Sequence, residues 1–270
     1  TTKSIKNYLE HGKTEPIILF ENYEENIKQI SQYIADLTKF DVDIIVSYIK
    51  HIFGDTKTGL DSNNDVEYVK KFCEQFDNDH TILIETDDIK NTKFTDEYLD
   101  KICSFISDKR KCTLTKVKTS GCHSLIYENN DNTITKIYLS DIKRNDFKVK
   151  INILEDYCST MDDINSVLIN YILCALLDNN CSSEIKEMYL VKCKSKGPSY
   201  EKIVTVIDKI NHNLEDLFDK HSKNISQIMF DNIFQKIIKL SHQIYQNTSL
   251  IHCDLKPDNI LINPDNLSDI

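Results

Sequence analysis

Apolar positions in residues 1–110 recur mostly at helical spacing. A first helix is predicted around residues 27–37, where four apolar side chains share one face: Ile27, Ile30, Ile34 and Leu37. A period of three to four residues is typical of an amphipathic helix. Three more helices are predicted over residues 42–53, 66–76 and 95–107. We therefore expect a mostly helical N-terminal region, to which the sequence assigns no chemical role.

From Cys112 onward the pattern changes to short runs that are typical of strands. Five strands are predicted, over residues 113–118, 124–128, 133–139, 188–193 and 202–207. A helix capped by Asp162 or Asp163 and running to residue 177 follows the third strand. A long amphipathic helix at 233–244 comes after the fifth strand. This order predicts an α+β fold, in which a small antiparallel sheet with one inserted helix is followed by a helical region.

Composition limits the classes of partner. The chain has 270 residues, of which 40% are hydrophobic and 28% are charged, and these fractions are ordinary for a globular protein. Its formal net charge of -10 argues against binding a nucleic-acid backbone, because that contact needs clustered Lys and Arg. A few local cations are still enough to hold one nucleotide. No apolar run reaches the roughly 18 residues of a membrane span, so we expect neither nucleic acid nor a membrane span.

The nine cysteines are scattered and form no Cys-x-x-Cys pair. Such pairs are the usual mark of a zinc site, and an odd count does not suit a closed disulfide framework. Residues 1–15 also lack the apolar core of a signal peptide. We therefore expect reduced thiols in a cytoplasmic protein.

One segment carries recognisable chemistry, the run Ile-His-Cys-Asp-Leu-Lys-Pro-Asp-Asn-Ile-Leu-Ile at residues 251–262. Five residue types stand at set positions in it: His252, Asp254, Lys256, Pro257 and Asn259. With each type at about one residue in twenty, a chance match in the chain is on the order of one in ten thousand. The alternative is a plain polar turn between a helix and a strand.

The spacing suits phosphoryl transfer, in which a protein mainly positions groups and neutralises charge. The Asp254 carboxylate would orient a substrate hydroxyl and accept its proton. Lys256 would stabilise the transferring phosphoryl group, and the amide oxygen of Asn259 would bind a metal ion. His252 would hold the backbone of the loop, and apolar neighbours on both sides would embed the loop in short buried strands.

This loop resembles the catalytic loop of the protein kinase family, and its Lys256 resembles the Ser/Thr kinases more than the Tyr kinases. The resemblance covers about residues 112–270 and agrees with the predicted order of strands and helices. It implies a kinase-like fold with an N-lobe over residues 111–210 and the start of a C-lobe over 211–270, preceded by the helical region 1–110. It also implies ATP and Mg²⁺ as cofactors and a protein hydroxyl as the acceptor.

The same resemblance assigns residues for holding ATP. Lys136, in the third predicted strand, matches the family's lysine that contacts the α- and β-phosphates. The segment 119–124 stands where a glycine-rich loop covers the phosphates, although it keeps only Gly121. The last strand leads into the hinge, which puts Ile207 at the gatekeeper position. Asp208 to Ile210 would then present backbone groups to adenine.

Departures from the family pattern keep an alternative open. The inserted helix has no glutamate to pair with the strand lysine, so Ser166 takes the usual place and Asp163 or Glu155 are the substitutes. Cys253 replaces the arginine that often precedes the catalytic aspartate. A pseudokinase that binds nucleotide or partners without catalysis is therefore the main alternative, and a small-molecule kinase is a minor one.

The sequence ends at Ile270, before the Asp-Phe-Gly motif that would follow the loop in the family. We therefore expect a segment of a longer kinase and an uncovered apolar side on the helix at 233–244. The Asn-, Ile- and Lys-rich composition is similar to that of kinases of large DNA viruses, including the poxvirus type, which implies the host cytoplasm. Residues 1–110 are candidates for binding a protein partner.

Overall fold

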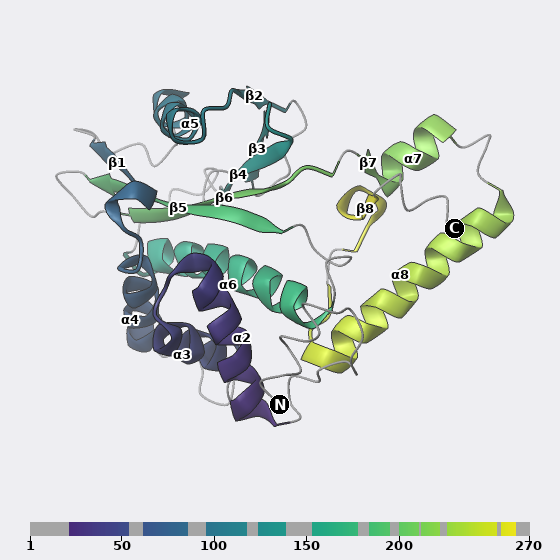
Figure 1. The fold of residues 1–270 in the computed structure, drawn as a ribbon, viewed down its shortest axis with the longest axis horizontal. Coiled ribbons are helices and arrows are strands. Elements are labelled where there is room, and N and C mark those ends of the chain that lie inside the picture. Colours follow the sequence, from purple (N-terminus) through teal and green to yellow (C-terminus); the bar gives the residue numbers. More distant parts are fainter. Residues whose placement is uncertain are drawn as a thin grey trace. The chain divides into compact units, whose positions relative to one another are not determined.

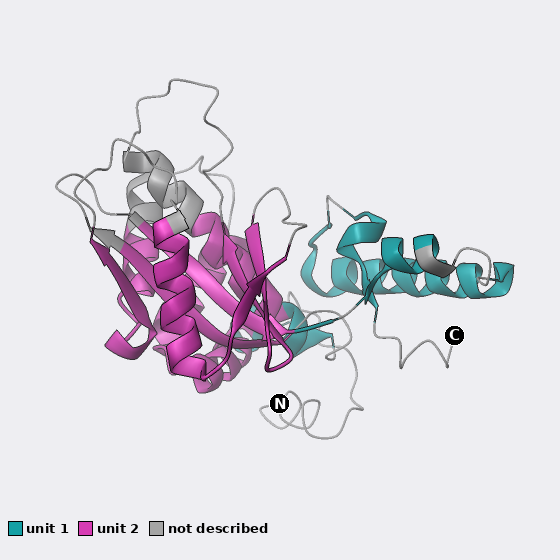
Figure 2. Ribbon diagram, turned by 90° about the horizontal axis from the view of Figure 1, so that it is seen from above, with its two compact units in different colours: residues 1–26, 173–183, 209–270 teal, residues 27–172, 184–208 magenta. Residues whose placement is uncertain are grey.

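The computed structural model describes residues 22–53, 62–85, 96–117, 124–138, 153–177, 184–194, 200–210, 212–221, 226–252 and 255–262. The chain divides into two compact units (Figure 2). Unit 1 comprises Thr1–Asn26, Leu173–Ser183 and Lys209–Ile270, and unit 2 comprises Ile27–Ile172 and Glu184–Asp208. One boundary between them falls between Asp208 and Lys209, inside the segment that the sequence predicts as the hinge.

A six-stranded sheet forms the centre of unit 2. Its strands are β1 (Thr81–Glu85), β2 (Leu114–Lys116), β3 (Ser124–Asn129), β4 (Thr133–Tyr138), β5 (Ile185–Lys194) and β6 (Tyr200–Asp208). They lie in the order β1-β5-β6-β4-β3-β2. All neighbours pair in antiparallel fashion except β1 and β5, which are parallel. The α+β class is therefore confirmed, whereas the expected antiparallel sheet is corrected to a mixed one.

Strand β1 lies within residues 1–110, where the sequence pattern predicts only helices. Its side chains alternate, because Ile82 and Ile84 are buried whereas Leu83 is 56% exposed. Alternation of this kind suits a half-buried strand at the edge of a sheet. Its partner β5 comes much later in the chain, and a local pattern gives no indication of such a distant parallel pairing.

Five helices lie wholly or mainly in unit 2: α2 (Tyr23–Thr38), α3 (Val42–Phe53), α4 (Ser62–Cys73), α5 (Asp96–Arg110) and α6 (Ile153–Leu176). A 3-10 turn, η1 (Asn78–His80), precedes β1. Figure 1 shows α5 on one face of the sheet and α6 on the other. A cluster of twelve buried residues joins α5 to the sheet, with Ile102 and Ile106 packed in the same core as Ile137 of β4. Residues of the N-terminal region therefore help to build the core around the sheet.

Helix α6 is longer than predicted. It begins at Ile153, so Asp162 and Asp163 lie inside the helix and neither caps its start. Asp163 is only 2% exposed. Ser166 is exposed and donates its hydroxyl to the carbonyl oxygen of Asp162 at 2.8 Å. Small polar residues favour helix starts, but tertiary packing often overrides this weak preference.

The described C-terminal part of unit 1 is a short strand pair with two helices. β7 (His212–Asn213) leads into α7 (Leu214–His221), and α8 (Gln227–Thr248) follows. A 3-10 turn, η2 (Pro257–Asn259), precedes β8 (Leu261–Ile262), which pairs with β7 in antiparallel fashion. Three buried residues form its core: Leu214, Leu217 and Ile233. This core is small for a unit that contains a 22-residue helix.

Both ends of α8 are capped. At the start, the hydroxyl of Ser226 accepts a hydrogen bond from the N–H of Met229 at 3.1 Å. At the end, Ser249 has a left-handed backbone with φ of 56°, and its N–H donates to the carbonyl oxygen of Tyr245 at 2.8 Å. No helix in the described part of the chain combines the length and apolar character that a membrane crossing requires.

Candidate nucleotide site

Lys136 lies in the middle of the sheet of unit 2. In β4 it stands directly opposite Thr205 of β6 and Ile126 of β3. Its side chain is half-buried, and its Nζ lies 4.6 Å from the centroid of the Tyr138 ring. A cation over an aromatic face is attracted by the ring quadrupole, whose face is negative. The Lys136 amine is therefore held by Tyr138, a residue of the same strand.

The face to which Lys136 belongs follows from strand geometry. Successive side chains of a strand point to opposite faces of the sheet, and directly paired residues share a face. Ile137 packs in the cluster with α5. Lys136, Thr205 and Ile207 therefore share the opposite face, which is the face of α6 (Figure 1).

Thr205 is a polar residue of this face that the sequence pattern does not single out. It is 1% exposed, and its hydroxyl has no hydrogen-bond partner among the described residues. A buried polar group without a partner costs free energy, so such a group calls for an explanation. The register of β4 on β6 reveals it as the direct neighbour of Lys136, which the linear sequence does not show.

The two hinge candidates at the end of β6 differ in their surroundings. Ile207 is half-buried opposite Ile134. Asp208 contacts the start of β5: its N–H donates to the carbonyl oxygen of Glu184, the residue before that strand, at 3.2 Å, and its carboxylate lies 3.1 Å from Lys186 Nζ. The N–H of Asp208 is therefore not free to reach adenine. Lys209 and Ile210, the other two residues of the predicted hinge segment, are half-buried.

Lys186 anchors the end of β6 to the start of β5. Its Nζ lies 2.7 Å from the carboxylate of Glu184 in addition to the contact with Asp208. The hydrogen bond that Lys186 donates to Glu184, and then the one that it donates to Asp208, raise the pKa of Lys186 above its usual range. The amine therefore stays charged between two carboxylates, and the strand end next to the hinge is tied by charge as well as by backbone pairing.

The loop that carries the sequence motif lies in unit 1 and is described in part. Asp254 and Cys253 lie outside the described residues, as does Gly121 of unit 2. Pro257 begins the 3-10 turn η2, which is closed by a hydrogen bond from the Asn259 N–H to the Lys256 carbonyl oxygen at 2.9 Å. Lys256 Nζ lies 3.4 Å from the Asp258 carboxylate.

Strand β8 anchors the loop to unit 1 on one side. The N–H of Leu214, at the start of α7, donates to the carbonyl oxygen of Ile260 at 2.8 Å. Ile260 and Ile262 pack against the small core of this unit. On the other side, Ile251 is 72% exposed. A short strand therefore follows the loop, but it is not the expected buried strand, because Leu261 is 49% exposed and Ile262 is only half-buried.

The candidates fall into two groups. Lys136, Thr205 and Ile207 share one face of the sheet in unit 2, and Lys256 and Asn259 follow one another in a turn of unit 1. Among the described residues, no three His, Cys, Asp or Glu side chains come together as ligands for a metal ion. Since Asp254 is outside those residues, this finding does not bear on a metal site that includes it.

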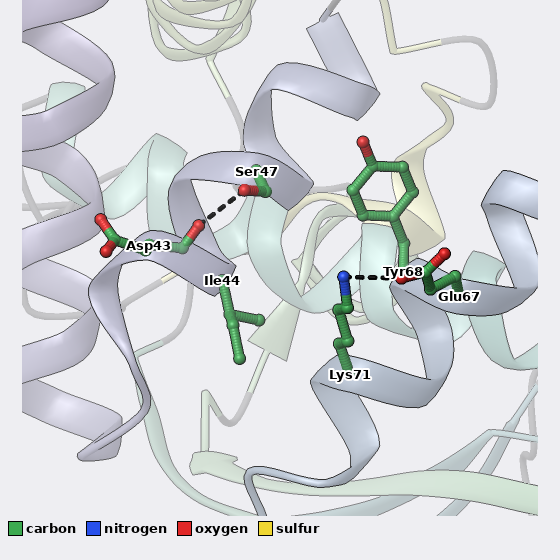
Figure 3. A pocket seen from close by; sticks show the side chains of 6 residues that line it. All are labelled: Asp43, Ile44, Ser47, Glu67, Tyr68 and Lys71. Atoms are coloured by element: carbon green, nitrogen blue, oxygen red, sulfur yellow. Dashed lines mark hydrogen bonds and ion pairs between the residues drawn. The ribbon is translucent and has the colours of Figure 1, made fainter.

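A separate pocket of about 430 Å³ lies between α3 and α4 and contains none of these candidates. Figure 3 shows its six lining residues: Asp43, Ile44, Ser47, Glu67, Tyr68 and Lys71. Lys71 Nζ lies 2.7 Å from Glu67, and the hydrogen bond between them raises the pKa of Lys71 and lowers that of Glu67. The charged groups are exposed and largely satisfy one another.

No protein-family model matches this sequence, and no curated protein is significantly similar to it. Support for a function therefore comes from the residues of the chain itself.

Proposed function

We propose that this chain is the nucleotide-binding part of an ATP-dependent protein Ser/Thr kinase. The observation that carries the proposal is the motif at 252–259, in which five residue types stand at the positions that phosphoryl transfer needs. Its support from unit 2 is a half-buried lysine in the middle of the sheet, one strand from the predicted hinge. A plain polar turn at 252–259 explains neither the motif nor this lysine.

The residues present fit a nucleoside triphosphate. Lys136 offers a cation on the face of α6, and beside it the buried Thr205 hydroxyl lacks a partner among the described residues. ATP would bring the γ-phosphoryl group, and Mg²⁺ would neutralise its charge. Lys136 would hold the α- and β-phosphates, and the backbone groups of Lys209 and Ile210 would meet adenine. Thr205 would gain a hydrogen bond or an ordered water in this environment.

The motif residues take their roles from chemistry. Asp254 would accept the proton of the protein hydroxyl, Lys256 would stabilise the moving phosphoryl group, and Asn259 would provide an oxygen ligand for the metal ion. Asp163 is the leading candidate for the acid that pairs with Lys136, because it is 2% exposed on α6. Ser166 is exposed, and the side chain of Glu155 lies outside the described residues.

A pseudokinase is the second candidate. The segment 119–124 has one glycine. Helix α6 has a single glutamate, Glu155, which lies in its first turn and not at the usual place of the family's glutamate. Both features weaken the case for catalysis more than the case for nucleotide binding. In either form we propose a cytoplasmic protein, in the host cytoplasm if the chain is viral, with a protein partner or substrate.

Nucleotide binding is tested first, by thermal unfolding with and without ATP and Mg²⁺. At ATP about 100-fold above the dissociation constant, a bound nucleotide stabilises the folded state by about 2.7 kcal/mol. Lys136→Met should lose most of this stabilisation. Lys116→Met is the matched control, because Lys116 is an exposed lysine of the same sheet on β2. Equal stabilisation of both variants by ATP contradicts the role of Lys136.

Catalysis is tested separately, with γ-labelled ATP and a generic protein substrate. Asp254→Asn should lower the rate of transfer by about 10²- to 10⁴-fold, the usual contribution of a positioned proton acceptor. The variant should keep its thermal stabilisation by ATP, since Asp254 contacts the acceptor. Stabilisation by ATP without any labelled product from the unaltered protein favours the pseudokinase.

A further inference from the structure

Arg110, at the end of α5, connects three elements of unit 2. Its Nε and Nη2 donate to Asp131 Oδ2 at 3.2 and 2.6 Å. Its Nη1 lies 2.7 Å from Glu187 Oε1 on β5. The arginine side chain is only 13% exposed. Asp131 lies in the turn between β3 and β4, so one guanidinium holds the helix, the turn and a strand of the sheet together.

From Asp131 the hydrogen bonds continue into β4. The Thr133 hydroxyl donates to Asp131 Oδ1 at 2.6 Å and accepts from Asn129 Nδ2 at 2.8 Å. Asn129 Nδ2 also lies 3.0 Å from the Thr135 hydroxyl. Asn129, Thr133 and Thr135 are all buried. The network thus runs from the helix to Thr135, which is the residue before Lys136.

We propose that Arg110 is a positioning residue for Lys136, so that helix α5 of the N-terminal region sets the strand that holds the phosphates. This inference rests on the proposed nucleotide binding. The planar guanidinium suits the task because it presents a rigid fork of donors to two carboxylates. Lysine offers a point charge on a flexible stem without this fixed fork of donors.

The apolar contacts of α5 act in the same direction. Ile102 and Ile106 pack in the cluster that contains Ile137, the residue after Lys136. Strand β4 is therefore held at the residue before Lys136 by the polar network, and at the residue after Lys136 by the apolar core. Only the polar part depends on Arg110, and this separates its role from general packing.

Hydrogen exchange tests the mechanical half of the proposal without any nucleotide. Arg110→Met should speed exchange of the β4 amides, residues 133–138, and leave that of α3 unchanged. Lys109→Met is the matched control, because Lys109 is the adjacent residue of α5 and pairs with Asp79 of η1 at 3.2 Å. Arg110→Lys, which keeps the charge and folds more readily, should give an intermediate effect. Unchanged protection of β4 in both Arg110 variants overturns the proposal.

Two ligands test the functional half. Arg110→Met should weaken ATP binding about tenfold, within the roughly 5- to 150-fold range of couplings between sites, and should leave adenosine binding unchanged. Adenosine lacks the phosphates that Lys136 would contact, whereas a merely structural role would weaken both ligands equally. In a Lys136→Met background, Arg110→Met should cause no further loss.

The outcomes separate this inference from the function on which it rests. Equal loss of ATP and adenosine binding, or full additivity with Lys136→Met, overturns the positioning role while nucleotide binding stands. An unaltered protein that binds no ATP refutes the proposed function and with it any role of Arg110 toward phosphates, even if exchange shows that Arg110 holds β4.

Discussion

Unit 2 and unit 1 bury their apolar side chains to different extents. In unit 2, the cluster between α5 and the sheet alone contains twelve buried residues. The corresponding cluster of α7 and α8 in unit 1 contains three. Eight of the ten large exposed hydrophobic side chains among the described residues belong to unit 1, and only Leu37 and Leu83 belong to unit 2.

Five of the eight exposed hydrophobic side chains in the described part of unit 1 lie on α8. Phe230 stacks on Phe234 with ring centroids 5.8 Å apart, and Ile238 and Tyr245 continue the row at helical spacing. They are 39 to 58% exposed. Contiguous exposed apolar surface usually marks a contact surface. Unit 2 thus completes its own core around the sheet, whereas the described part of unit 1 does not bury the apolar face of its longest helix.

The largest expected effect comes from cutting into the core of unit 2. Ile102→Ala removes a fully buried side chain between α5 and the sheet. Loss of burial and the remaining cavity should lower the free energy of unfolding by about 2–5 kcal/mol. This change in the free energy of unfolding is measured by urea unfolding, monitored by circular dichroism.

The matched change in unit 1 is Ile238→Ala, since Ile238 is 58% exposed. It should change the free energy of unfolding by no more than about 0.5 kcal/mol, and it should lower the binding of an apolar dye such as bis-ANS. If Ile238→Ala lowers the free energy of unfolding about as much as Ile102→Ala does, Ile238 is covered in solution and the two units do not differ as described.

An intermediate effect is expected from the Arg110 network, and it depends on pH. Burial alone would raise the pKa of Asp131, but the hydrogen bond from Thr133 and the neighbouring Arg110 outweigh it and lower the pKa. A carboxyl whose pKa is lower in the folded protein stabilises the fold above its unfolded pKa of about 3.9. That contribution is lost as the pH falls through the lower folded pKa.

Asp131→Asn should therefore be less stable than the unaltered protein at pH 7, and the difference should shrink as the pH falls below about 4. Asp108→Asn, on the exposed side of α5, is the control and should follow the unaltered protein. A difference between Asp131→Asn and the unaltered protein that stays constant down to low pH would show that the Asp131 charge does not contribute.

The smallest expected effect is at the end of α8. Ser249 has a left-handed backbone, with φ of 56°, and this conformation favours glycine. Ser249→Gly should raise the free energy of unfolding of unit 1 by up to about 1 kcal/mol. Ser226→Ala at the other end should lower it by about 1 kcal/mol, because the Met229 N–H loses its acceptor. Changes of opposite sign in the free energy of urea unfolding for the two variants support both caps, and changes of equal sign contradict them.

Much of the fold follows from local pattern. The helical spacing at residues 27–37 predicts α2, and the strand-like runs at 124–128 and 133–139 predict β3 and β4. The turn between these strands agrees with its asparagines, because Asn132 has a φ of 63°, which asparagine tolerates better than most residues. Elements that bury one face and end at polar turns are thus visible in the sequence.

Features that depend on distant pairing were not predictable. β1 needs the edge of β5, and its short apolar run gives no indication of a parallel partner. The start of α6 at Ile153 lies well before the two aspartates that suggest a cap, of which Asp162 is exposed and Asp163 is buried inside the helix. Of the candidate site, Lys136 follows from its strand, whereas Thr205 and the engaged N–H of Asp208 follow only from the register.

The central claim of the proposal is that Lys136 of unit 2 contacts the phosphates of ATP. An ATP derivative with an acyl group on its terminal phosphate tests it directly, because a nearby lysine amine displaces ATP and keeps the acyl group. Mass spectrometry should find Lys136 acylated and protected by excess ATP and Mg²⁺, while Lys116 shows no such protection. Acylation of Lys136 at the level of Lys116, with no protection by ATP, would contradict the account.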